Sequence, residues 1–442
     1  MTPNAISATS AAARSSNGAR KIPNLRWWIT GLLFFSTVIN YMDRQNLSIL
    51  ARTIQDDLHI TDLQYSYVVQ AFLLAYTLSY LVAGRLTDYL GTRVSMACFV
   101  VWWAIADMAT SLSRGLVSLG FFRFLLGMGE PGNYTAAPKA VSEWFPPKER
   151  ALVIGIYTAG ATLGATLAPP LIAYLGSRFH WRTVFLFTGS LGLIWVLPWL
   201  WLYRRPEEHP RLTEEERTLI AADSATAAEA GEAMPAEGRW RYILTRRETW
   251  LLMFGRMITD PVWYFYLFWF PKYLLDARHL TLAEVGRIAW IVYLAADIGC
   301  ILGGYFSGVL IKRGWKPVRS RLWVMAIAAV LLPLSPLINS APTPLLAVCI
   351  AGSAAFAHLT WQISLSALVL DLYPKPVVGT VFGLVAAGSG LGGMISTNLV
   401  GRAVTYWSYA PVFIVMGFLH PVAYLMITCL RKREPRASKE VL

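Results

Sequence analysis

The chain has 442 residues, of which 55% are hydrophobic and only 15% are charged, and its mean hydropathy is +0.46. These values exclude an ordinary soluble protein and indicate a membrane protein. The formal net charge is +13, but the basic residues lie in short clusters between apolar runs. We therefore read them as topology signals, and we expect the partner surface to be a lipid bilayer and not nucleic acid.

Apolar segments predict an all-α protein that crosses the membrane twelve times, because a spanning helix needs about 20 mostly apolar residues. The candidate spans are 27–50, 62–84, 94–113, 117–142, 151–176, 182–203, 249–275, 283–311, 321–339, 343–371, 377–403 and 407–430. The longest polar interruption, 204–248, divides them into two six-helix bundles, 27–203 and 249–430. Within this linker, "RLTEEERTLIAA" predicts a short surface helix capped by Thr213 and Glu216.

Basic residues set the expected orientation. With both ends of the chain inside, 28 of the 39 Lys and Arg residues fall on the cytoplasmic side and seven on the other side. This bias places a polar N-terminal tail (1–26), the linker and a C-terminal tail (431–442) in the cytoplasm. We expect a multi-pass protein of the inner (plasma) membrane.

An internal repeat relates the two halves. "WFPPKERALVIGIYTAGATLGA" from Trp144 recurs as "LYPKPVVGTVFGLVAAGSGLGG" from Leu372, at a constant offset of 228 residues. The glycines that match are Gly155, Gly160 and Gly164 with Gly383, Gly388 and Gly392. Duplicated halves are typical of transporters that bind substrate near the bilayer midplane and rock around it.

The loop between the second and third spans, "GRLTDYLGTR", holds Gly84, Asp88, Gly91 and Arg93. Its glycines permit a tight turn and close helix contact. Asp88 can pair with a cation at a helix end, so we expect the four residues to form a conformational latch. The second half has a degenerate copy from Gly304. Together with twelve spans and a duplicated half, the loop resembles the signature of the major facilitator superfamily.

Charged residues interrupt two of the predicted spans. Asp43 and Arg44 lie in "NYMDRQNLSIL" of the first span, and Arg123 and Glu130 lie two turns apart on one face of the fourth. One such charge at the bilayer centre costs ~2.5–3.5 kcal/mol. A buried network that only fixes helix packing is the simpler explanation, but such pairs rarely stabilise more than an apolar core does. We therefore favour a functional role.

These four residues suit proton-coupled anion transport. An arginine offers a planar fork that matches a carboxylate, and a carboxylate that loses its arginine in a low dielectric takes up a proton. Anion binding and protonation are then linked, with Asp43 and Glu130 as the proton-coupling pair.

The motifs sharpen the resemblance. "NYMDR" with "RFLLGMGE" resembles the anion:cation symporter family within that superfamily, and the segments from Asp260 and His358 resemble its bacterial hexuronate transporters. The sequence departs from the related aldonate carriers at Ala161, where we expect a glutamine, and in "AAGSGLGG", which lacks asparagines. The exact sugar acid is therefore left open.

The resemblance implies a role for each matching residue. Arg44 and Arg123 would contact or gate the anion, and Tyr41 and Tyr76 would line the sugar site. In the second half we add Tyr264 and a face with His358 at i, Trp361 at i+3 and Gln362 at i+4, since aromatic, amide and imidazole groups suit a polyol. Packing against lipid or neighbouring helices is the alternative for these aromatic residues.

We therefore expect a proton-coupled importer of a hexuronate or related sugar acid that works by alternating access. Alternatives are a symporter of another carboxylate (an aldonate, an aromatic acid or a dicarboxylate), a drug/proton antiporter, whose expected G-P-x-x-G-G ending is missing, or a membrane sensor or channel. No pattern indicates an enzyme, a cofactor or a metal site. We expect a monomer whose small partners are an organic anion and protons.

Overall fold

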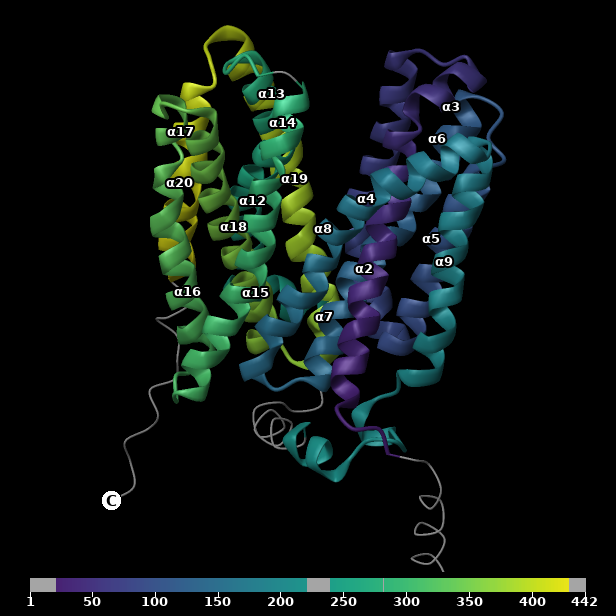
Figure 1. Ribbon diagram of the computed structural model, residues 1–442. Helices are drawn as coiled ribbons and strands as arrows, with labels where there is room; N and C mark the ends of the chain where they lie inside the picture. The colour runs from purple at the N-terminus through teal and green to yellow at the C-terminus, as the bar shows by residue number, and fades with distance from the viewer. Residues whose placement is uncertain (1–20, 221–238, 281, 429–442) are drawn as a thin grey trace, which may run out of the picture.

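The computed structural model describes residues 21–220, 239–280 and 282–428. Two helical bundles lie side by side, one from the N-terminal half (purple to teal) and one from the C-terminal half (green to yellow) (Figure 1). The predicted C-terminal tail (431–442), most of the N-terminal tail and linker residues 221–238 lie outside the described residues.

The helices of the N-terminal bundle follow the predicted spans closely. They are α2 (Leu25–Ile49), α3 (Ala51–Leu58), α4 (Asp62–Leu90), α5 (Thr92–Thr110), α6 (Leu116–Gly129), η2 (Glu130–Gly132), α7 (Asn133–Trp144), α8 (Pro147–Arg178) and α9 (Trp181–Leu202).

The linker and the C-terminal bundle continue the helical pattern. Their elements are η3 (Pro206–Glu208), α11 (Arg239–Thr245), α12 (Arg247–Tyr264), η4 (Phe265–Trp269), α13 (Phe270–Asp276), α14 (Leu282–Ile288), α15 (Trp290–Lys312), α16 (Pro317–Leu331), η5 (Leu332–Leu334), α17 (Leu337–Ser340), α18 (Pro344–Leu372), η6 (Lys375–Val377), α19 (Val378–Tyr406) and α20 (Ala410–Ile427).

Several spans that we predicted as continuous helices are interrupted. The fourth span breaks at η2, a 3₁₀ turn, because Pro131 has no backbone N–H to continue the α-helical ladder. The seventh changes to a π-helical turn, η4, four residues after Pro261. Such turns inside helices frequently occur at functional sites.

Nine helical segments of the described chain are long and apolar enough to cross a bilayer. The three other predicted spans are α2, the broken unit α6–η2–α7 and the π-interrupted unit α12–η4–α13. These three carry the charged groups Asp43, Arg44, Arg123, Glu130 and Asp260, which lowers their hydropathy. Anchoring in the membrane does not explain the charged residues of these three spans, so they need another explanation.

The short helix predicted in the linker is present at 214–220. The Thr213 hydroxyl accepts a hydrogen bond from the Glu216 backbone N–H at 3.3 Å, as an N-cap does. The Glu216 carboxylate also accepts from the Leu25 backbone N–H at 3.1 Å. This contact joins the linker to the beginning of α2.

The bundles meet along two seams, α4 against α19 and α8 against α15. A Cβ atom at Gly155 of α8 would lie 2.4 Å from the Cys300 carbonyl oxygen of α15. At Gly383 of α19 it would lie 2.2 Å from the Tyr80 carbonyl oxygen of α4. Gly155 and Gly383 are equivalent positions of the sequence repeat, so the duplication places one backbone-to-backbone contact at each seam.

Candidate functional site

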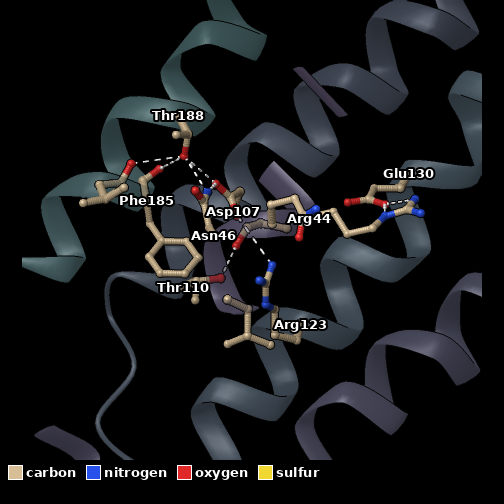
Figure 2. Close-up of polar contacts among 12 residues, drawn as sticks. Arg44, Asn46, Asp107, Thr110, Arg123, Glu130, Phe185 and Thr188 are labelled. Atoms are coloured by element: carbon tan, nitrogen blue, oxygen red, sulfur yellow. Dashed lines mark hydrogen bonds and ion pairs between the residues drawn. The ribbon is translucent and has the colours of Figure 1, made fainter. Parts of the chain in front are cut away.

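Arg44 of α2 and Glu130 form an ion pair inside the N-terminal bundle (Figure 2). Nε of Arg44 donates to Oε2 of Glu130 at 2.9 Å, and Nη2 donates to the same oxygen at 2.5 Å. The guanidinium also lies 4.8 Å from the ring centre of Tyr41 and 4.7 Å from that of Tyr76, distances typical of cation–π contacts. The two tyrosines predicted to line the site therefore flank this arginine.

The two members of this pair differ in exposure. The Glu130 side chain is fully buried, whereas 27% of the Arg44 side chain is exposed. Within the described part of the chain, Oε1 of Glu130 has no hydrogen-bond partner. Arg44 is thus the member that a solute can reach, and Glu130 keeps one acceptor atom for a proton.

Arg123 of α6 pairs with a residue that the sequence did not single out. Its Nη1 lies 3.6 Å from Oδ1 of Asp107 on α5, and both side chains are buried. The Asp107 carboxylate accepts from Nδ2 of Asn46 at 3.0 Å and from the Thr188 hydroxyl at 3.0 Å. Figure 2 shows this group beside the Arg44–Glu130 pair. The sequence predicted two carboxylates facing two arginines, whereas the structure brings three carboxylates to the two arginines.

Asp43 is the other predicted carboxylate of this site. It is fully buried on α2, one residue before Arg44, and neither of its oxygens has a hydrogen-bond partner among the described residues. The charges that act on it are those of Asp107, Glu130 and Arg123. A buried carboxylate without a partner is costly in its ionised form.

Polar groups of the C-terminal bundle form a second cluster. His358 is buried, stacks on Trp263 with ring centres 6.1 Å apart, and lies 3.2 Å from His420 of α20 between ring nitrogens. Trp361 is fully buried, with its ring 5.2 Å from that of His420. The aromatic face predicted on this helix is therefore packed against α20 in this structure.

Other predicted residues of this bundle lie at more accessible positions. Gln362 and Tyr264 are half-buried, and the Tyr264 hydroxyl lies 3.3 Å from that of Ser389 on α19. Asp260 lies one turn before Tyr264 and accepts a hydrogen bond from Nε of Arg256 at 2.9 Å. This half thus adds one more arginine, which is already paired within α12.

Two of the four predicted latch residues, Gly84 and Asp88, lie at the first seam. The Asp88 carboxylate accepts from Nζ of Lys139 at 2.7 Å, from the backbone N–H of Gly379 at 3.1 Å, and from the N–H and hydroxyl of Thr380 at 2.7 and 2.6 Å. It therefore binds the N-terminal end of α19, where a negative charge is favoured. A Cβ atom at Gly84 would lie 2.3 Å from the Gly379 carbonyl oxygen.

The other two latch residues stay within the N-terminal bundle. Gly91 joins α4 to α5 with a φ of 77°, which suits glycine. A side-chain nitrogen of Arg93 donates to the Leu200 carbonyl oxygen of α9 at 2.5 Å. These two residues shape the turn, while Gly84 and Asp88 make the contact between the bundles.

The second seam carries a charge group of its own. Asp371 of α18 lies 3.3 Å from Nη1 of Arg150 on α8 and 3.1 Å from Nε of Arg321 on α16, and all three side chains are nearly inaccessible. Gly308 occupies the position of Asp88 in the degenerate copy of the loop, so the charged contact at the second seam is made by other residues.

The family model described as Major Facilitator Superfamily matches residues 33–397. The chain belongs to the major facilitator superfamily. It is therefore a multi-pass membrane transport protein and not an enzyme, which confirms the fold and the superfamily predicted from the motifs.

Within the superfamily, two relatives are similar over most of this chain. A protein named hexuronate transporter from Escherichia coli (strain K12) is 31% identical over 94% of this chain and 96% of its own length. A protein named galacturonate transporter from Dickeya chrysanthemi is 36% identical over 76% and 97%. The solved structure of the proton:xylose symporter XylE, at 13% identity, covers 90% of this chain and 94% of its own with a TM-score of 0.70, a likeness of fold.

Proposed function

We propose that this protein imports a hexuronate or a related sugar acid together with protons, by alternating access. One observation carries the proposal: Arg44 is partly exposed between two tyrosine rings while its carboxylate partner is buried. The names of the two relatives support the substrate class, because both refer to hexuronic acids.

In this mechanism the substrate carboxylate competes with Glu130 for the fork of Arg44. Arginine binds one carboxylate with two parallel N–H donors, so a bound anion removes donors from Glu130. A buried carboxylate that loses its cation is stabilised by taking up a proton. Binding of the anion and uptake of a proton therefore favour each other. The proton-coupling role extends to Asp43, which is fully buried and makes no hydrogen bond of ordinary geometry among the described residues.

Recognition of the sugar ring is assigned to polar and aromatic groups of both bundles. Tyr41 and Tyr76 would contact it from the N-terminal bundle, and Tyr264, Gln362 and His358 would do so from the C-terminal bundle. Hydroxyl and amide groups hydrogen-bond a polyol, and ring faces stack on its C–H groups. Trp361 would support His358 through α20, and it would contact substrate only after repacking.

Alternating access requires the bundles, with proposed bounds 27–203 and 249–430, to rock about the substrate. The two seams and the latch at Asp88 would separate when the site opens toward the cytoplasm. The excess of basic residues supports cytoplasmic ends and linker in the inner membrane. Since both bundles belong to one chain, a monomer is sufficient for transport.

The direct test is uptake into proteoliposomes. Labelled galacturonate and glucuronate should accumulate under an inward proton gradient and stop accumulating with a protonophore. An aldonate, an aromatic acid, a dicarboxylate and a cationic drug form the comparison panel. Accumulation of another panel member alone would reject the hexuronate assignment, and a sodium requirement without a pH response would reject proton coupling.

A variant separates coupling from binding. Glu130→Gln has the shape of the protonated acid but cannot titrate, so exchange of substrate across the membrane should continue while gradient-driven accumulation fails. Asp43→Asn is the parallel case. If both variants accumulate substrate with the wild-type pH dependence, neither carboxylate carries the proton.

A further inference from the structure

We propose that Asp107 is a third carboxylate of the coupling machinery, a positioning residue that competes with Asp43 for Arg123. Arg123 pairs with Asp107 while Asp43 holds a proton, and it turns to Asp43 when that proton leaves. This inference rests on the proposed proton-coupled function and adds a residue from α5 to it.

The contacts of Asp107 differ from those of Asp43. Asp107 has two neutral donors, Asn46 from α2 and Thr188 from α9, each at 3.0 Å. Asp43 makes no hydrogen bond of ordinary geometry within the described chain, and the one donor that faces it is the indole N–H of Trp103. Since hydrogen bonds to the ionised form favour that form, Asp107 is equipped to stay ionised and Asp43 is equipped to hold a proton.

The charge balance requires such a proton. Asp43, Asp107 and Glu130 face two guanidiniums, those of Arg44 and Arg123, and all but Arg44 are nearly inaccessible. With every group ionised, the five residues carry a formal charge of −1. A net charge inside a low-dielectric protein is strongly disfavoured, so one proton makes the group neutral. The carboxylate that makes no hydrogen bond of ordinary geometry, Asp43, is the one that takes it.

Arg123 is free to change partner. Its contact with Asp107 is 3.6 Å long, outside normal hydrogen-bond range. Nε and Nη1 of Arg123 have no hydrogen-bond partner in the described part of the chain. Asn46 lies three residues after Asp43 and therefore on the same face of α2. Since Asn46 contacts Asp107, this face of α2 also meets Asp107. A short side-chain movement is therefore enough to transfer Arg123.

The step releases one proton and leaves the five residues with a formal charge of −1, a costly state that favours uptake of the next proton. The proton on Asp43 leaves to the solution on the side to which the transporter is open, and Asp43 becomes an anion. Arg123 then pairs with Asp43, while Asn46 and Thr188 continue to solvate Asp107. The other groups that face this pair are Glu130, which is held by Arg44, the indole of Trp103 on α5, and Tyr65 of α4.

The test is the pH midpoint of substrate uptake by the purified full-length protein in proteoliposomes. In Asp107→Asn, Arg123 is left to Asp43 alone and the group is neutral without a proton. Protonation of Asp43 then needs a more acidic solution. We expect the midpoint to move toward acid by about one pH unit or more, the effect of an opposite charge at this range. Asp107→Glu restores the charge and should restore the wild-type midpoint.

Two further variants keep the result unambiguous. Thr188→Val removes one donor to Asp107, whose ionised form then depends more on Arg123. Asp43 then keeps its proton more readily, so the midpoint should move the opposite way, toward alkali, by a smaller amount. This variant provides the test if Asp107→Asn does not fold. Thr110→Val is the control: it removes a buried hydroxyl of α5 that donates to the Ala106 carbonyl, and its midpoint should equal that of the wild type.

The outcomes separate this inference from the proposed function. Wild-type protein that shows no proton-dependent uptake overturns both. Proton-dependent wild-type uptake, with an unchanged midpoint in folded Asp107→Asn or, failing that, in folded Thr188→Val, overturns only the role of Asp107. An equal shift in Asp107→Asn and Asp107→Glu would show that Asp107 acts through packing and would also overturn it.

Discussion

Substitution of Gly84 by alanine should weaken the closed state of the first seam. The new Cβ atom would lie 2.3 Å from the Gly379 carbonyl oxygen, whereas ordinary contact begins near ~3.5 Å. α4 and α19 must therefore separate by roughly 1 Å. The bond from the Thr380 N–H to Asp88, now 2.7 Å, would then exceed hydrogen-bond range. Each such charge-assisted bond is worth ~1.5–3 kcal/mol, so losing one or two costs about 3 kcal/mol, a roughly hundredfold shift toward separated bundles.

The shift can be measured with spin labels at Tyr89 and Lys312, which are exposed on α4 and at the end of α15, in a protein without native cysteines. Gly84→Ala should move their distance distribution to longer values and slow uptake. Gly120→Ala is the matched control, because a Cβ atom there meets nothing within 4 Å and alanine favours a helix. An unchanged distribution with wild-type uptake in Gly84→Ala would refute the reasoning.

Four other substitutions test other parts of the structure. Arg44→Lys keeps the charge but loses the planar fork, so uptake should fall at least ~10-fold with normal membrane insertion; wild-type affinity would show that the arginine is structural. Asp371→Asn leaves two arginines buried without their carboxylate, which should destabilise the fold by ~3–5 kcal/mol and lower the melting temperature in detergent; an unchanged melting temperature would contradict this. Trp361→Ala should lower the melting temperature because a fully buried ring is lost, whereas Gln362→Ala should change the ranking of sugar acids with little change in stability; the reverse pattern would exchange their roles.

Local patterns were sufficient to predict the helices and part of the site. Apolar runs predicted the spans, and the i, i+7 spacing of Arg123 and Glu130 placed both in one span. The same pattern could not show that η2 turns Glu130 toward Arg44 and leaves Arg123 to another helix. Asp107 offered a signal, an acidic residue in the middle of the third span, but its partners come from three other helices and only the fold brings them together.

Only the N-terminal bundle's part of the contact between the bundles, Asp88, was predictable from the sequence. The loop motif indicated that Asp88 pairs with a cation, and the structure shows Lys139 beside it, but the motif did not indicate that Asp88 also binds the beginning of α19. Asp88 meets the beginning of α19 because of how the two bundles pack together, and no local sequence pattern predicts that packing. The burial of Trp361 has the same origin, because it depends on which face of α18 meets α20.

The backbone contacts at the two seams have a consequence for how such a transporter can diversify. Where Gly155 and Gly383 meet the opposing helix, carbonyl groups form the contact, so the fit depends on the absence of side chains and not on particular ones. Substitutions that alter the residues around Arg44 can therefore change the solute without disturbing the surfaces that move. Variants selected for a new sugar acid should accumulate changes near that arginine and retain glycine at both seam positions.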